Sequence, residues 1–96
     1  MGMIRVQEIC GAGDTGPQGE QLYNAILSEL AQHDQIAISF AGIDTATSSF
    51  VNASLFRLLS NISLDEIKRR VKIIDSSRQI NDMIKRRLTR EATVAA

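Results

Sequence analysis

The first half of the chain alternates between strand-like and helix-like spacings of apolar residues. Residues 3–10 alternate in part and run into a glycine-rich stretch, which indicates a first strand. From Pro17 to about residue 32, apolar side chains recur with helical spacing, which predicts an amphipathic helix. Residues 35–41 are mostly apolar, as expected of a strand buried on both faces of a parallel sheet, and Gly42 marks its end.

The second half contains a second helix, a third strand and two further helices. Hydroxyl residues 47–49 are natural N-caps for the second helix, and Ser63 with Glu66 forms a capping-box pattern before a short helix over residues 64–69. Three of the four residues 71–74 are β-branched and apolar, which indicates the third strand. Ser76 with Gln79 repeats the capping pattern before the last helix, whose apolar stripe is Ile80, Met83, Ile84 and Leu88.

The order β-α-β-α-α-β-α predicts a small α/β domain. We expect a mostly parallel sheet of three to four strands, joined by right-handed crossovers and covered by about four helices. Residues 1–90 form this single domain, and residues 91–96 are expected to fray. A sheet so narrow leaves room for a missed short strand, or for a homo-oligomer in which a free edge pairs with another copy of the chain.

Composition places the chain among ordinary folded proteins. It has 96 residues, of which 44% are apolar and 23% are charged. No apolar run approaches the roughly 20 residues of a membrane helix, and the start lacks the order of a secretory signal, so we expect a cytoplasmic protein without membrane contact. Cys10 has no second cysteine to pair with, which favours a core role over a reactive one.

Charge is unevenly distributed although the net charge is zero. Residues 1–66 carry two basic and eight acidic side chains, a net of −6, whereas residues 67–96 carry nine basic and three acidic ones, a net of +6. A solvated surface with internal ion pairs is the simplest interpretation. Self-association through opposite charges, or a partner that meets one charged face, is the alternative.

The glycine-rich stretch is a candidate ligand or anion loop formed by Gly11, Gly13, Asp14, Thr15 and Gly16. It matches the G-x-G-x-x-G pattern between a strand and a helix, where backbone N–H groups can hold a pyrophosphate. The context differs from a dinucleotide site, because Pro17 follows the last glycine and no acidic residue ends the second strand. A connecting loop is the simpler interpretation, and a small-ligand or nucleotide-binding module is the first alternative function.

Catalytic, metal and nucleic-acid sites have weaker support. His33 is the one histidine and has no cysteine cluster near it, so we predict no catalytic residue, no metal and no cofactor. The basic runs 68–70 and 85–87 could contact phosphates, which makes a nucleic-acid binder the second alternative. That function is unlikely because all four aromatic residues precede residue 57 and none is interleaved with these runs.

Three consecutive hydroxyl residues, Thr47, Ser48 and Ser49, open the second helix, although a single N-cap suffices. A phosphate added there gains from the helix dipole and places about two negative charges on the surface that a partner would meet. The stretch is therefore a candidate partner-binding site that phosphorylation could switch off.

Residues 36–52 carry a resemblance to a known family. They form a buried strand, a turn containing Asp44, and then Ser48-Ser49-Phe50 at a helix start. This order resembles the STAS-like domain family of unknown function found in bacteria and mobile elements, and the glycine-rich loop and the strand and helix from Val71 also fit it. Members are similar to the STAS domains of anti-sigma-factor antagonists.

The resemblance implies a non-enzymatic regulatory module that binds a protein partner. In the antagonist domains a strand leads to Asp-Ser-Ser-Gly, and a partner kinase phosphorylates a serine there. Ser48 would match that serine and Ser49 the next one, whereas Thr47 replaces the aspartate and Phe50 replaces the glycine. The resemblance also implies docking by the turn from Thr47 to Phe50, which Asp44 would help to shape, on a histidine-kinase-like ATP-binding protein.

Overall fold

The chain folds as a mixed α/β domain. The computed structural model describes the backbone of residues 2–95 and the side chains of residues 2–87. In that part of the chain the elements are β1 (Gly2–Arg5), α1 (Val6–Cys10), α2 (Gly16–Gln32), β2 (Ile36–Ser39), α3 (Ser48–Ala53), the 3-10 helix η1 (Phe56–Ser60), α4 (Leu64–Arg70), β3 (Val71–Ile74) and α5 (Arg78–Ala95).

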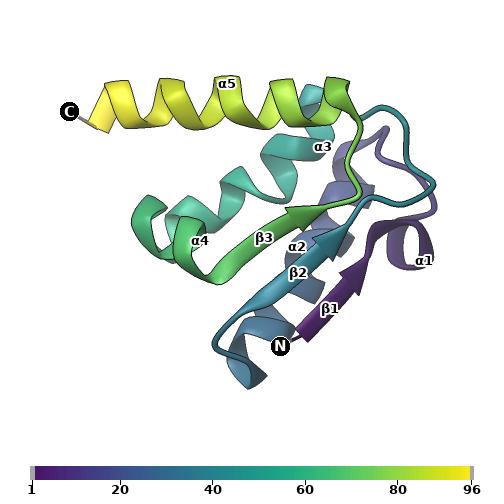
Figure 1. Cartoon of the computed structure of the whole chain (residues 1–96), viewed down its shortest axis with the longest axis horizontal. Helices are drawn as coiled ribbons and strands as arrows, with labels where there is room; N and C mark the ends of the chain where they lie inside the picture. Colours follow the sequence, from purple (N-terminus) through teal and green to yellow (C-terminus); the bar gives the residue numbers. More distant parts are fainter. Residues whose placement is uncertain (1, 96) are drawn as a thin grey trace.

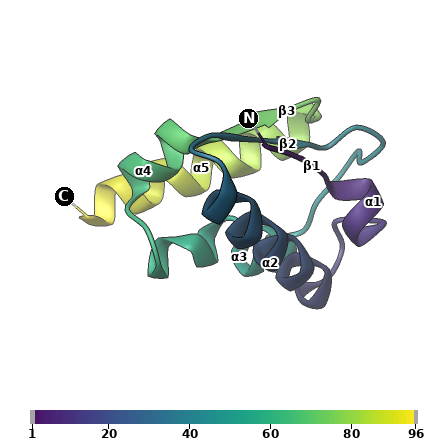
Figure 2. The same ribbon diagram turned by 90° about the horizontal axis from the view of Figure 1, so that it is seen from below.

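The described strands form one parallel sheet in the order β1-β2-β3 (Figure 1). Both crossovers step across the sheet in the same direction, so the helices they contain are expected on the same face. Figure 2 shows α2 and α3 together on one side of the strands. No described helix crosses the face that is turned to the viewer in Figure 1. The parallel sheet of the prediction is confirmed, with helices gathered on one of its faces.

Alternation along each strand divides the sheet into two faces. The register aligns Ile4 with Ile38 and Ile73 on the face toward α2 and α3, and Met3 with Ala37 and Lys72 on the other. Met3 is 50% exposed, yet all four residues of β2 are buried, because Ala37 and Ser39 are small and lie between the side chains of both neighbouring strands.

The hydrophobic core lies between the sheet and the helices. Its largest fully buried side chains are Phe40, Phe50, Ile4, Leu22, Ile26, Ile36, Ile38, Leu58 and Ile80. They come from β1 and β2, from α2, α3, η1 and α5, and from the loop after β2. The apolar stripes predicted from the sequence therefore supply this core.

The prediction of a strand over residues 3–10 is wrong from Val6 onward, where α1 begins. A continued strand would turn Glu8 toward the same face as the buried Ile4 and Val6, which would bury a carboxylate without a partner. A helical turn leaves Glu8 exposed and keeps Val6 in the core. Gly11 ends the turn with a φ of 77°, a conformation that glycine adopts at low cost.

The second predicted helix is divided at Ser54. Its hydroxyl donates to the carbonyl of Phe50 at 2.7 Å, and the buried side chain competes with the next helical hydrogen bond. The chain then continues as η1 rather than as regular α-helix.

Helix α5 begins one residue later than the capping pattern predicts. The Ser77 hydroxyl accepts the N–H of Ile80 at 3.2 Å, so Ser77 is the N-cap in place of Ser76. The helix continues to Ala95, through most of the stretch 91–96 predicted to fray, and side chains beyond Arg87 lie outside the described residues.

Candidate functional site

The turn before α3 is held in place by Thr47. Its hydroxyl accepts the N–H of Phe50 at 3.2 Å and donates to the carbonyl of Asp14 at 2.9 Å. Its backbone N–H donates to the carbonyl of Gly13 at 2.9 Å. Thr47 is therefore both the N-cap of α3 and the residue that attaches the turn to the glycine-rich loop. Two regions that the sequence offers as separate candidate sites meet at this residue.

Helix α5 fixes the same turn from the other side. The Gln79 amide bonds both backbone groups of Ala46, accepting from its N–H at 3.1 Å and donating to its carbonyl at 3.3 Å. The Ser77 hydroxyl donates to the carbonyl of Asp44 at 2.6 Å. Asp44 helps to shape the turn through this backbone contact, while its side chain is exposed.

Ser48 and Ser49 are exposed at the start of α3. Within the described residues their hydroxyls make no hydrogen bond, because Thr47 alone supplies the side-chain cap. Helix capping therefore accounts for one of the three hydroxyl residues. The other two are available to a partner or to a modifying enzyme.

Phe50 is fully buried in the core, with 0% of its surface exposed. The sequence offers it as a partner-binding residue, and the structure does not support that role. As the third residue of α3 it points inward, whereas Ser48, Ser49 and Asn52 are exposed. Phe50 instead fixes the position of α3 on the core.

The glycine-rich loop is filled by the chain itself. The Gln18 side-chain oxygen accepts the N–H groups of Asp14 and Thr15, each at 3.0 Å, and the Thr15 hydroxyl accepts the N–H of Gln18 at 3.3 Å. These reciprocal bonds are a capping box for α2. Two backbone donors that a phosphate would need are therefore occupied, which weakens the ligand-loop alternative. The Thr15-x-x-Gln18 spacing in the sequence is the signal that predicts this.

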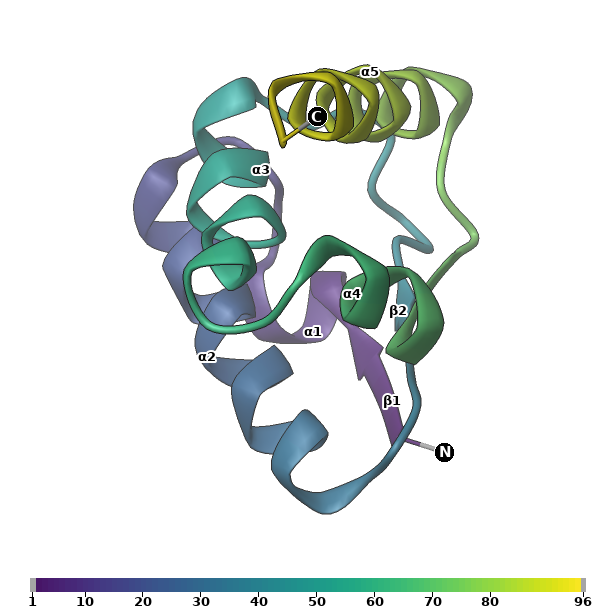
Figure 3. The same cartoon turned by 90° about the vertical axis from the view of Figure 1, so that its left-hand side faces the viewer.

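A cleft of about 490 Å³ lies between α3 and α5; in Figure 3 α5 is seen almost end-on, and α3 lies lower and to its left. Ser48 and Asn52 line it from α3, and Gln79 and Arg86 line it from α5. The sequence pairs Ser48 with none of these α5 residues. Because they are more than 25 residues apart in the chain, no local spacing could have indicated the contact.

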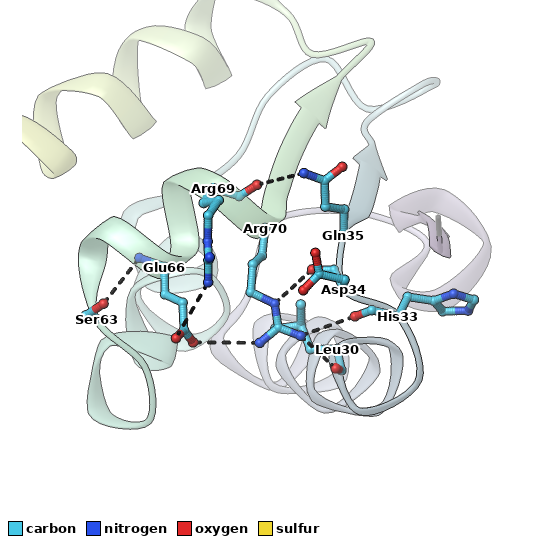
Figure 4. A network of polar contacts seen from close by, with 8 residues as sticks. All are labelled: Leu30, His33, Asp34, Gln35, Ser63, Glu66, Arg69 and Arg70. Atoms are coloured by element: carbon cyan, nitrogen blue, oxygen red, sulfur yellow. Dashed lines mark hydrogen bonds and ion pairs between the residues drawn. The ribbon is translucent and has the colours of Figure 1, made fainter.

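Arg70, the last residue of the first basic run, is committed to the fold, as Figure 4 shows. The Arg70 guanidinium donates to three carbonyls at the end of α2, those of Leu30 (2.9 Å), His33 (3.2 Å) and Asp34 (2.8 Å), and lies 3.6 Å from the Glu66 carboxylate. Arg70 thus satisfies carbonyls that a helix C-terminus leaves without partners. This use of Arg70 weakens the nucleic-acid alternative.

The side chains of Cys10 and His33 each contact another residue of the fold. The Cys10 thiol donates to the carbonyl of Gln18 at 3.2 Å, and burial raises its pKa, so it is less often a thiolate than an exposed cysteine. The His33 ring lies 3.5 Å from Glu29 at the end of α2.

Within the described residues no group of three metal-ligating side chains occurs, and no described helix has the length and apolarity to cross a membrane.

Thr47→Ala is expected to lower the free energy of unfolding by about 1 kcal/mol, because it removes the N-cap of α3 and the bond to Asp14. Ser48→Ala and Ser49→Ala are matched controls that should change it by less than about 0.5 kcal/mol. Urea unfolding followed by circular dichroism measures all three. Equal losses in the three variants would contradict the assignment of the cap to Thr47.

Comparison with known proteins gives one match. Residues 18–81 match the family model described as STAS-like domain of unknown function (DUF4325), and this stretch is more than half of the chain. It contains the turn from Thr47, all of α3 and the Arg70 network. No curated protein and no solved structure matches the chain.

Proposed function

The chain belongs to the family of STAS-like domains of unknown function, and from this premise we propose that it is a non-enzymatic regulatory module that binds a protein partner. The partner binds at the exposed start of α3. We call Ser48, Ser49 and Asn52 the docking face.

The observation that carries this proposal is that two exposed hydroxyls, those of Ser48 and Ser49, lie on a turn whose backbone is held in place. Thr47 performs the capping, and the glycine-rich loop and α5 hold the turn from both sides. A docking surface whose backbone is already ordered loses little conformational entropy on binding. Ser48 and Ser49 stand on that support without a structural task of their own.

A hydrolase built on Ser48 has little support. The single histidine, His33, follows the last residue of α2, whereas Thr47 is bonded to Asp14, which lies just before the start of that helix. A helix of 17 residues is about 25 Å long at 1.5 Å per residue, which separates the imidazole from the serine by far more than a hydrogen bond. We therefore assign Ser48 to recognition rather than to catalysis.

Phosphorylation of Ser48 is the proposed switch. The added group carries about two negative charges and three acceptor oxygens, and on the docking face it would meet the partner directly. In keeping with the resemblance to anti-sigma-factor antagonists, the proposed partner is a histidine-kinase-like ATP-binding protein. Its binding and its kinase activity would act on the same serine.

The test uses the histidine-kinase-like protein encoded nearest to this chain as the candidate partner. Ser48→Asp is expected to weaken the complex at least tenfold, because it places a carboxylate on the docking face, whereas Ser48→Ala should change the affinity less than threefold. Ser28→Asp, on α2, is the matched control for an added charge elsewhere. Isothermal titration calorimetry gives the dissociation constants. The switch is rejected if Ser48→Asp and Ser28→Asp have the same effect.

A further inference from the structure

The cleft between α3 and α5 combines an apolar floor with a basic wall. Val51 and Phe56 are buried at its floor, and Met83 is half-buried beside them. Arg86 and Arg87 line it along α5. The cleft opens next to Ser48, so it continues the docking face toward α5.

The charges around the cleft favour an acidic occupant. Among the described residues that line it, Arg86 and Arg87 are basic and Asp82 is acidic, and the neighbouring Lys85 on α5 is exposed. Arg86 is exposed and forms no ion pair within the described residues, whereas the Arg87 guanidinium lies 5.4 Å from the centre of the Phe56 ring. A carboxylate entering the cleft would gain a charge-assisted hydrogen bond from Arg86, and a basic group would be repelled.

We infer that this cleft receives an acidic amphipathic segment of the partner protein. One apolar side chain of the segment packs on Met83, and a carboxylate beside it binds Arg86. The inference rests on the proposed function, since it gives the chemistry of the partner that meets the docking face. Because Ser48 lies at the edge of the cleft, a phosphate on Ser48 would face the carboxylates of the bound segment and repel them.

A peptide fits the cleft better than a nucleic acid does. Bases bind by stacking on exposed aromatic rings, and the one aromatic residue of the cleft, Phe56, is buried with Arg87 over its ring. An aliphatic side chain does not need an exposed ring to stack on.

The experiment selects 12-residue peptides from a random phage-displayed library on the purified chain. We expect enrichment of peptides in which Asp or Glu flanks Leu, Ile or Phe. A synthetic copy of the most enriched peptide should lose at least tenfold in affinity on Arg86→Glu. Lys72→Glu is the matched control, because Lys72 is equally exposed but lies on the open face of the sheet, and it should lose less than threefold.

Amide chemical shifts on peptide addition locate the binding site and should change at Asn52, Gln79 and Met83. The inference is overturned if no peptide is enriched, if the enriched peptides are basic, or if Arg86→Glu and Lys72→Glu weaken binding equally. Tighter Arg86-dependent binding of a DNA or RNA oligonucleotide than of the peptide would also overturn it. The proposed function fails separately, when Ser48→Asp leaves the complex with the candidate partner unchanged.

Discussion

Gly19→Ala is expected to lower the free energy of unfolding by about 2 kcal/mol. Gly19 lies where α2 and α3 cross. An added Cβ would lie 2.5 Å from the carbonyl oxygen of Phe50 and 2.9 Å from the Cβ of Ala53. Alanine would by itself favour the helix by up to about 1 kcal/mol, but a contact with backbone cannot be relieved by turning a side chain. The two helices must separate.

Gly16→Ala is the matched control, because no atom lies within 4 Å of the Cβ position at the start of the same helix. It should leave the free energy of unfolding within about 0.5 kcal/mol of the wild type. Thermal unfolding provides the readout, since a loss of 2 kcal/mol in a domain of this size corresponds to a fall in Tm of about 8–16 °C. A fall of the same size in Gly16→Ala would assign the effect to glycine replacement in general rather than to the helix crossing.

The contact between α2 and α3 at Gly19 also determines the position of the docking face. Phe50 packs into the core from the same turn of α3 that carries Ser48 and Ser49 outward. Thr47 then joins this turn to the loop that begins α2. Moving α3 away from α2 would therefore strain the turn that holds both serines. The fold and the proposed site depend on one helix contact.

The sequence predicts the elements that are defined by local spacing. Helix α2 begins beside Pro17, and the mostly apolar residues 71–74 form β3, because apolar periodicity and turn chemistry act over a few residues. Ser63 caps α4 as its spacing with Glu66 predicts, accepting the N–H of Glu66 at 3.2 Å. Such signals need no knowledge of the rest of the fold.

What the sequence misses depends on contacts between distant segments. Residues 3–10 alternate only in part, and this partial alternation does not reveal that a helix begins at Val6. Gln79 is typical of a capping box, yet its amide binds Ala46, 33 residues earlier. The cleft that joins Ser48 to Arg86 exists because α5 packs beside α3. Charge counting likewise assigns Arg70 to a basic surface, whereas its position beside the end of α2 gives it a structural task.

Arg70→Met is expected to lower the free energy of unfolding by about 3 kcal/mol. Methionine keeps most of the apolar stem but removes the guanidinium that bonds the carbonyls of Leu30, His33 and Asp34. The Arg70 side chain is 19% exposed, and its bonds to the Leu30 and His33 carbonyls are partly buried, so water replaces these two bonds less readily than the exposed bond to Asp34. Hydrogen bonds that involve a charged group contribute about 1.5–3 kcal/mol each, and loss of the nearby ion pair with Glu66 adds to the effect.

Arg69→Met is the control that separates this anchoring from net charge. Arg69 is the neighbouring arginine, 69% exposed, and its one ion pair in the described chain spans 3.9 Å to Glu66. A solvated pair of this kind contributes little, so the loss should stay below about 0.5 kcal/mol. Urea unfolding of both variants at low and high salt completes the comparison. The anchoring role requires a large loss at Arg70 that persists in high salt, because partly buried bonds are screened less than surface pairs. Equal losses, or a loss at Arg70 that disappears in salt, would make the run 68–70 an ordinary basic surface and would strengthen the case for nucleic-acid binding.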